Sequence, residues 1–149
     1  MSYKGKFKPK NPEKYKGNTQ NIVYRSLWEL KAMRYFDMNP NVIFWASEEL
    51  VIPYLSPVDN KTHRYFPDFL IQVQKKDNSL ETYLLEVKPH KQTTLPVKKG
   101  KKNSRFLSES MTYAINQAKW KAADIFCQKN GWKFKLITEY ELGIKKTNK

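Results

Sequence analysis

The clearest pattern of apolar and polar positions lies in the second half of the chain. Residues 132–137, WKFKLI, alternate between apolar and charged side chains, which predicts a half-buried strand. Over residues 108–129, apolar side chains recur every three or four positions, which predicts a helix. Its apolar stripe consists of Met111, Ile115, Ala118, Ala122 and Ile125. Ser108 is a candidate cap for this helix, and Gly131 is a suitable stop.

The first half of the chain shows a shorter helical pattern followed by strand-like segments. Residues 22–37 carry apolar side chains at helical spacing, with Asn21 as the candidate N-cap. Residues 42–54 predict two short strands around a turn near Ser47, and the turn-rich residues 56–63 predict a hairpin loop. Two further strands are expected at 64–73 and 81–88, and Pro67 marks an edge, a bulge or a strand end. This order of elements predicts an α/β fold with a central mixed β-sheet flanked by helices.

Length and composition are consistent with a single soluble domain. The 149 residues, 40% of them hydrophobic, suffice for one compact core. We expect the domain to span residues 19–144, preceded by a basic extended arm at 1–18 and followed by a basic tail at 145–149. Aromatic residues in the arm could stack on bases or pack the arm down. The single Cys127 excludes an internal disulfide, and the chain has no membrane-length apolar run or signal-type core, so a reduced cytoplasmic protein is expected.

The formal net charge of +14 favours a polyanionic partner. Nucleic acid is a better candidate than a membrane surface, because clustered cations release counterions from phosphates and no basic amphipathic helix is evident. The densest cluster is the loop at 88–105, and two basic residues precede Asp68. The residues expected to contact DNA are therefore Lys91, Lys98, Lys99, Lys101, Lys102 and Arg105 of the loop, together with His63 and Arg64.

Two carboxylates carry the candidate chemistry. Asp68 and Glu86 lie in apolar strand-like segments, where an unpaired charge is costly. The turn at 75–79 makes the two segments antiparallel neighbours, so Asp68 can lie beside Glu86 or Lys88, while Val87 points into the core. Two carboxylates ~4 Å apart repel by ~4 kcal/mol at an effective dielectric constant of ~20.

A divalent cation would remove this repulsion. Magnesium accepts one or two protein carboxylates and completes its shell with water and substrate phosphate. The pair therefore predicts a metal-dependent nuclease, with Lys88 orienting the attacking water or offsetting negative charge. The alternative is that Asp68 caps a turn while Glu86 and Lys88 form an ordinary surface pair.

The pattern Glu29 … Pro67-Asp68 … Glu86-Val87-Lys88 resembles the PD-(D/E)XK nuclease superfamily. Longer segments are similar to the TnsA-like endonuclease family, and the chain as a whole is similar to the head completion nucleases of T-even-like tailed bacteriophages. These segments are SLWELKAMRYF, SEELVIPY, HRYFPDFL, LLEVKP, QAKWKAADIFC and FKLITEYEL. The resemblance implies a restriction-endonuclease-like core.

The resemblance also implies roles for individual residues. Glu29, Asp68 and Glu86 would be metal ligands, the Val87 carbonyl an additional ligand, and Lys88 the catalytic lysine. Gln117 on the following helix would be a further catalytic residue, with Lys121 contacting DNA one turn later. Mg²⁺ is the implied cofactor, with Mn²⁺ as a substitute. For Glu29 the alternative is a local ion pair with Arg25 at i−4.

The implied task is DNA cleavage at a late stage of phage assembly. The protein would be an endodeoxyribonuclease that processes or secures the packaged DNA end before tail joining. Its partners would be double-stranded DNA and phage head or portal proteins, with homodimerisation an option, and its location the host cytoplasm or the virion. One alternative is a structural head-completion protein that binds DNA and carries a vestigial site. Another is a subunit that cuts only together with a partner protein.

Overall fold

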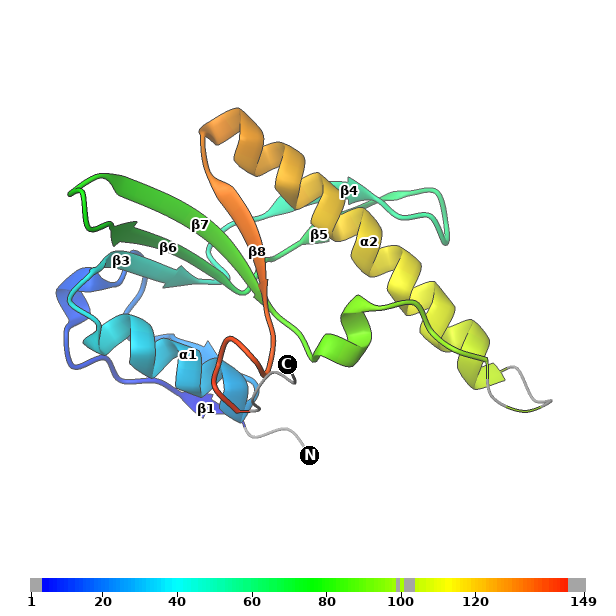
Figure 1. The fold of residues 1–149 in the computed structure, drawn as a ribbon, viewed down its shortest axis with the longest axis horizontal. Coiled ribbons are helices and arrows are strands. Elements are labelled where there is room, and N and C mark those ends of the chain that lie inside the picture. Colours follow the sequence, from blue (N-terminus) through cyan, green and yellow to red (C-terminus); the bar gives the residue numbers. More distant parts are fainter. Residues whose placement is uncertain (1–3, 99, 101–103, 145–149) are drawn as a thin grey trace.

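A computed structural model of the chain describes residues 4–98, 100 and 104–144. A four-stranded sheet of order β3-β6-β7-β8 forms the centre, with α1 on one side and α2 on the other (Figure 1). Two small sheets, β1-β2 and β4-β5, flank it. The elements are β1 (Gly5–Lys6), η1 (Pro12–Lys14), β2 (Val23–Tyr24), α1 (Leu27–Met38), β3 (Val42–Ser47), β4 (Ile52–Leu55), β5 (Thr62–Tyr65), β6 (Phe69–Gln74), β7 (Leu80–Val87), η2 (His90–Thr93), α2 (Ser104–Asn130) and β8 (Lys133–Ile137).

The central sheet is mixed. β3 pairs with β6 and β6 with β7 in antiparallel fashion, whereas β7 and β8 are parallel. A parallel pair needs a long crossover connection, and the segment between β7 and β8 supplies it with η2 and α2. The α/β fold with a mixed sheet and flanking helices, predicted from the order of elements, is therefore confirmed.

Alternation along the central strands separates two hydrophobic clusters. In β7, Leu85 packs with Met33 and Phe36 of α1, whereas the preceding Leu84 packs with Trp120 and Ala123 of α2. Because successive strand residues point to opposite faces, one strand serves both clusters. The sheet is therefore covered on both sides, and only its ends and edges remain available for a functional site.

Helix α1 begins later than the sequence suggests. The predicted helix at 22–37 with Asn21 as cap is wrong at its start, because Val23–Tyr24 form β2, paired with β1. The helix instead starts at Leu27, and its N-cap is Ser26, whose Oγ accepts a 3.1 Å hydrogen bond from the Glu29 backbone N–H. β-branched and aromatic residues before Ser26 favour a strand, and the Ser-x-x-Glu spacing marks the true start.

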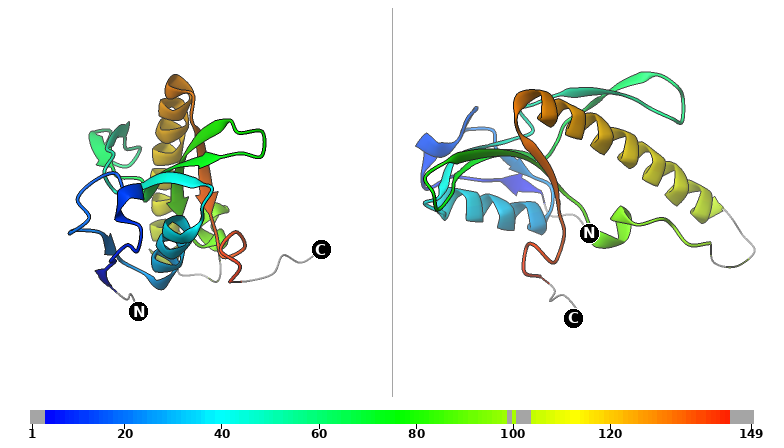
Figure 2. Two further views of the ribbon diagram at one scale, coloured as in Figure 1. Left: turned by 90° about the vertical axis from the view of Figure 1, so that its left-hand side faces the viewer. Right: turned by 45° about the horizontal axis from the view of Figure 1, so that its top comes forward.

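The segment expected to be an extended arm packs against the domain from residue 5 onward (Figure 2). Phe7 and Tyr15 are buried, and their rings make edge contacts with Trp45. Buried Asp37 accepts backbone hydrogen bonds from Lys10 at 2.8 Å and Asn11 at 3.0 Å. Of the two uses considered for the arm aromatics, Phe7 and Tyr15 therefore serve packing. Tyr3 and the tail at 145–149 lie outside the described residues.

The predicted strand at 64–73 is two strands in different sheets. Tyr65 ends β5, which pairs with β4, and Phe69 begins β6 in the central sheet. Between them, Pro67 is fully buried and cannot donate a ladder hydrogen bond. The chain therefore changes sheets at Phe66-Pro67-Asp68, which leaves Asp68 at the entrance to β6.

Helix α2 is longer than predicted and its packed face differs. It starts at Ser104, so Ser108 lies inside the helix instead of capping it, while Gly131 ends it with φ +71°. Met111 and Ile125, expected in the apolar stripe, are exposed, whereas Trp120 and Cys127 are buried. Despite its length, neither α2 nor any other helix in the described ranges is apolar enough to cross a membrane.

Candidate active site

Asp68 and Glu86 lie opposite each other at the end of the β6-β7 ladder. The last register pair is Phe69 with Leu85, and one step further sets Asp68 against Glu86. Asp68 Oδ2 accepts a 2.7 Å hydrogen bond from the Val87 backbone N–H. Both carboxylates belong to the sheet face that Leu84 shares with α2, because they alternate with Leu85 and Phe69 on the α1 side. The structure thus brings together the two acids that the sequence predicts as neighbours.

Burial and mutual repulsion make this pair unfavourable as two free anions. Burial raises the pKa of Asp68 to about 8, and the negative charge of Glu86 contributes in the same direction. Burial also raises the pKa of Glu86, a residue that is 7% exposed. A bound cation would favour the charged forms of both groups. The pair therefore has the electrostatic character of a cation site.

Each of the two carboxylates has one oxygen held by a protein donor. Tyr65 Oη donates a 2.7 Å hydrogen bond to Glu86 Oε1, just as Val87 N–H holds Asp68 Oδ2. Glu86 Oε2 faces Lys88 Nζ at 3.8 Å, and Asp68 Oδ1 has no hydrogen-bond partner among the described residues. One oxygen of each carboxylate is therefore oriented by a hydrogen bond, while the second oxygen of Glu86 faces the Lys88 ammonium.

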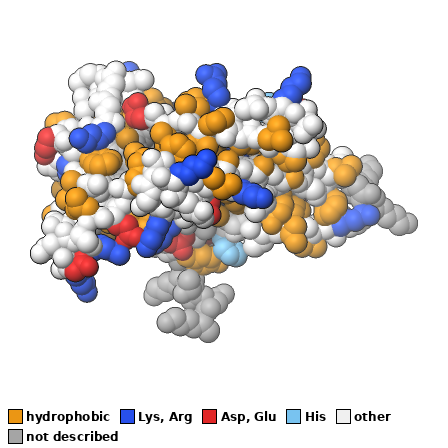
Figure 3. Space-filling model, turned by 90° about the horizontal axis from the view of Figure 1, so that it is seen from above, with side chains coloured by type: hydrophobic (Ala, Val, Ile, Leu, Met, Phe, Trp, Pro, Cys, Tyr) orange, Lys and Arg blue, Asp and Glu red, His pale blue; other side chains and the backbone are white. Residues whose placement is uncertain are grey.

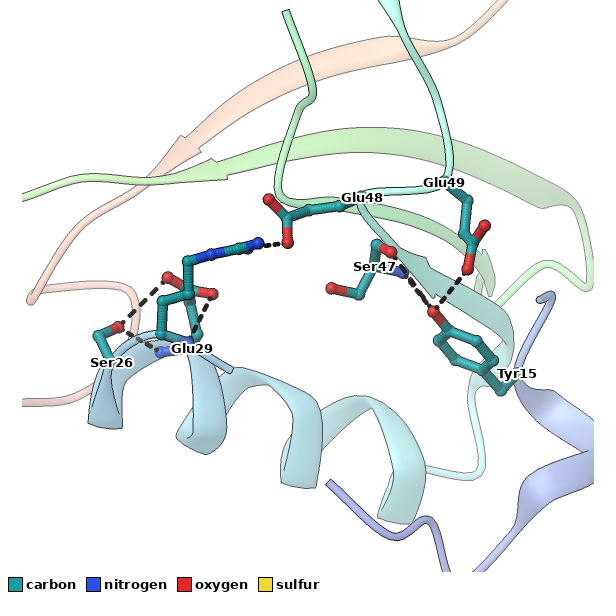
Figure 4. A network of polar contacts seen from close by, with 7 residues as sticks. Tyr15, Ser26, Glu29, Ser47, Glu48 and Glu49 are labelled. Carbon is teal, nitrogen blue, oxygen red and sulfur yellow. Dashed lines mark hydrogen bonds and ion pairs between the residues drawn. The ribbon is translucent and has the colours of Figure 1, made fainter. Parts of the chain in front are cut away.

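Glu29 lies in the first turn of α1, close enough for its charge to act on Asp68. Its Oε1 accepts a 3.3 Å hydrogen bond from the Arg25 backbone N–H, and Ser26 Oγ lies 3.5 Å from Oε2 (Figure 4). Burial raises the pKa of Glu29, and its charge also raises the pKa of Asp68. Glu29 therefore acts electrostatically on the site although no direct contact joins it to Asp68.

The alternative partner of Glu29, the Arg25 side chain, is engaged elsewhere. The Arg25 guanidinium pairs with Glu48, and Arg25 donates only its backbone N–H to Glu29. The charge of Arg25 still opposes the rise in the pKa of Glu29 that burial causes. Glu48 follows β3 with a left-handed φ of +53°, and its backbone N–H donates to the Asp68 carbonyl at 3.1 Å. The bend at Glu48 thereby places this ion pair beside Glu29 and the entrance to β6.

No ready-made cage of metal ligands is formed. Within residues 4–98, 100 and 104–144, no three His, Cys, Asp or Glu side chains converge closely enough to hold a metal ion. Asp68 and Glu86 are thus a two-carboxylate site, which Glu29 could join only by moving or through water. Two carboxylates fit magnesium, which retains several waters and takes other ligands from substrate phosphates.

Helix α2 faces the carboxylate pair with a different residue from Gln117, which the resemblance implied. Gln117 and Lys121 are exposed, and with Asp124 and Gln128 they form the solvent stripe of the helix. The structure therefore does not bring Gln117 toward the carboxylates. Instead, Lys119 lies on the packed side, where its charge partly offsets the rise in the pKa of Glu86 that burial causes.

The basic residues expected to contact DNA are exposed wherever they are described. Lys91 and Arg105 line a groove of ≈ 740 Å³ between the η2 segment and the start of α2, and Lys98 is exposed in the connecting loop. Arg105 also pairs with Glu109 at 3.0 Å. Lys99, Lys101 and Lys102 lie outside the described residues. Neither carboxylate lines this groove, so the groove and the acidic pair are separate features.

His63 and Arg64 are exposed on β5 of the β4-β5 hairpin. The His63 ring hydrogen-bonds to Asp59 at 2.7 Å, and the Arg64 guanidinium lies 5.9 Å from the Phe66 ring centroid. On the face shown in Figure 3, lysine and arginine side chains are dispersed among apolar and uncharged groups. Phosphate contacts would therefore be spread over several elements instead of concentrated in one block.

Sequence reasoning missed Tyr65 and Lys119. Tyr65 precedes Asp68 by three residues, but the change of sheet at Pro67 hides its position relative to Glu86. For Lys119 a signal existed, because the predicted stripe residues Ile115 and Ala122 flank it on the helix. A lysine on a packed face indicates a specific role more often than a lysine on a solvent stripe.

Comparison with known proteins identifies the family of the chain. Residues 39–139 match the family described as TnsA-like endonuclease N terminal, a range that contains Asp68, Glu86 and Lys88. The chain is similar to the protein named "Head completion nuclease" of Enterobacteria phage T4, with 41% identity over 143 residues that cover 93% of each chain. No solved structure matches the chain. The chain belongs to the TnsA-like endonuclease family.

Proposed function

We propose that this protein is a magnesium-dependent DNA endonuclease that acts in the completion of a phage head. The observation that carries the proposal is the pair of carboxylates, partly buried Asp68 and buried Glu86, beside Lys88 at one end of the central sheet. A nuclease role is supported by membership in the TnsA-like endonuclease family and by the similarity to a head completion nuclease.

Asp68, Glu86 and the Val87 carbonyl would hold the metal, and Glu29 would complete the set directly or through water. Mg²⁺, or Mn²⁺ in its place, would activate a water molecule and neutralise charge developing on the phosphate. Val87 N–H and Tyr65 Oη keep the two carboxylates oriented before substrate arrives. Lys88 extends from the same sheet face, so its ammonium can hold the attacking water or a phosphate oxygen.

The test is cleavage of supercoiled plasmid and linear duplex by the purified protein with Mg²⁺, Mn²⁺ or EDTA. Asp68→Ala, Glu86→Ala and Lys88→Ala are each expected to lower the cleavage rate by roughly 100-fold or more, because each removes a group acting at the reacting phosphate. Asp77→Asn is the matched control: Asp77 is an exposed acid in the turn at the other end of the same two strands. Asp68→Ala with wild-type cleavage would refute the assignment.

A structural role is the second candidate, favoured by the absence of three converging acids in the described chain. The protein would then hold the packaged DNA end or dock on head and portal proteins with a vestigial site. Complementation distinguishes the two roles. Phage carrying Asp68→Ala should make full heads that fail to become infectious if cleavage is required, and normal titres if the role is structural. Analytical ultracentrifugation tests whether chains pair, as cutting both strands would favour.

A further inference from the structure

Lys119 occupies an unusual position for a lysine. It lies on the side of α2 that packs against the β4-β5 hairpin, one residue before buried Trp120. Its Nζ lies 5.6 Å from the Tyr65 ring centroid and 5.9 Å from that of Tyr54. An ammonium near two aromatic faces is held by its attraction to the rings. The hairpin and the helix therefore fix the position of this cation jointly.

The Lys119 ammonium has hydrogen-bonding capacity to spare. Throughout the described chain, no hydrogen bond or ion pair to Nζ is formed, and its protein contacts are the two rings. Lys75 and Lys133, by contrast, both pair with Glu81. An aromatic face orients an ammonium without using up its three N–H donors.

The same cation is tied to the carboxylate pair. Tyr65, one of its two rings, donates to Glu86 through its hydroxyl, and the charge of Lys119 acts on Glu86. Tyr65 thus contacts both the candidate metal ligand and the cation. A DNA strand carries one phosphate per about 3.4 Å of helix axis, so a strand whose phosphate meets Asp68 and Glu86 has neighbouring phosphates close by.

We propose that Lys119 is a substrate-binding residue that donates to a phosphate oxygen of the DNA strand cleaved at Asp68 and Glu86. The inference rests on the proposed nuclease function and adds a binding residue to it. In this arrangement Lys88 serves the reacting phosphate from the sheet, and Lys119 holds the strand from α2. The two tyrosine rings keep Lys119 in place, so little side-chain freedom is lost when DNA binds.

The test measures binding of a duplex to the full-length protein by fluorescence anisotropy, with Ca²⁺ in place of Mg²⁺, over a range of salt concentrations. Lys119→Gln is expected to reduce the slope of log K against log salt by about 0.9, the loss of one phosphate contact. Cleavage in Mg²⁺ should fall by about 10- to 100-fold. Lys119→Arg, which retains the charge, should recover most of the slope and of the rate.

Lys129→Gln is the matched control, because Lys129 is exposed in the last turn of the same helix. If Lys119→Gln does not fold, as judged by circular dichroism, Lys119→Met keeps the packing volume and replaces it. A Lys119 variant whose slope and cleavage rate equal those of Lys129→Gln overturns the inference. If the wild type fails to cut in any metal, the proposed function fails, while the salt slope still decides whether Lys119 contacts DNA.

Discussion

Tyr65 Oη donates a 2.7 Å hydrogen bond to Glu86 Oε1, although the two residues belong to different sheets. The bond connects the small β4-β5 hairpin to the end of the central sheet. Burial raises the pKa of Tyr65, so the phenol stays protonated and remains a donor. A group that fixes a metal-ligating carboxylate influences metal affinity without touching the metal.

Tyr65→Phe should therefore weaken the metal site while preserving the fold. The ring still packs, but Glu86 loses its fixed donor, and we expect metal affinity or activity to fall by about 10- to 100-fold. Magnesium titration of the cleavage rate and calorimetry with Ca²⁺ measure the two effects. Tyr35→Phe is the control, since Tyr35 is an exposed tyrosine of α1. Equal metal affinity in the two variants would show that the Tyr65 hydroxyl does not organise the site.

The carboxylate pair makes the metal-free protein less stable at higher pH. The pKa of Asp68 is about 8 in the folded chain, against an ordinary value of 3.8. Between these values the folded state binds more protons than the unfolded state, so the free energy of unfolding falls as pH rises. Below pH 4 both states are protonated and the effect vanishes.

Asp68→Asn should accordingly stabilise the metal-free protein at pH 8, by about 1–3 kcal/mol, and have little effect at pH 4. Asparagine keeps an oxygen for the Val87 N–H and carries no charge to repel Glu86. Urea unfolding in EDTA at several pH values measures the difference between the wild type and the variant. Saturating Mg²⁺ should remove the advantage of the variant, because the cation stabilises only the intact pair. A variant less stable than wild type at pH 8 would contradict this account.

Asp37 should be a main determinant of the docking of residues 5–18. Its carboxylate accepts the backbone N–H groups of Lys10 and Asn11 and is 2% exposed. Asp37→Ala leaves both donors without partners, and we expect the free energy of unfolding to fall by about 2–4 kcal/mol. Trypsin should then cut the lysine-rich segment faster than in the wild type. Unchanged proteolysis and stability would instead describe an independent arm, as the sequence suggested.

The sequence predicted the central ladder well because the relevant signals are local. Alternation and the turn at 75–79 predicted that Asp68 lies beside Glu86 or Lys88, and the observed register of β6 and β7 selects Glu86. The end of β3 at Ser47 and the end of α2 before Gly131 were likewise predictable from the local sequence of these turns.

Other features depend on contacts between distant segments. Whether Phe7 and Tyr15 pack or extend is decided by Trp45, more than 25 residues away, and no local pattern reports it. Gln117 was chosen by resemblance, whereas the rotation of α2 about its axis, set by its packing on the β4-β5 hairpin, brings Lys119 to the rings of Tyr54 and Tyr65. The rotation of a helix about its axis is set by side-chain packing against the neighbouring strands. The apolar stripe in the sequence predicts this rotation only approximately.

Ser26, the observed cap of α1, and Ser108, the cap expected for the second helix, give a paired test of where the helices begin. Ser26 Oγ accepts the Glu29 N–H at the start of α1, so Ser26→Ala should lower the free energy of unfolding by about 1 kcal/mol. Ser108 lies inside α2, where alanine is the better helix former, so Ser108→Ala should be neutral or raise it by up to about 0.5 kcal/mol. Urea unfolding of both variants measures the contrast. Because Ser26 also lies beside the Glu29 carboxylate, its variant should cleave DNA more slowly than Ser108→Ala if Glu29 serves the metal. The reverse order of stabilities would mean that the chain starts its helices where the sequence first suggested.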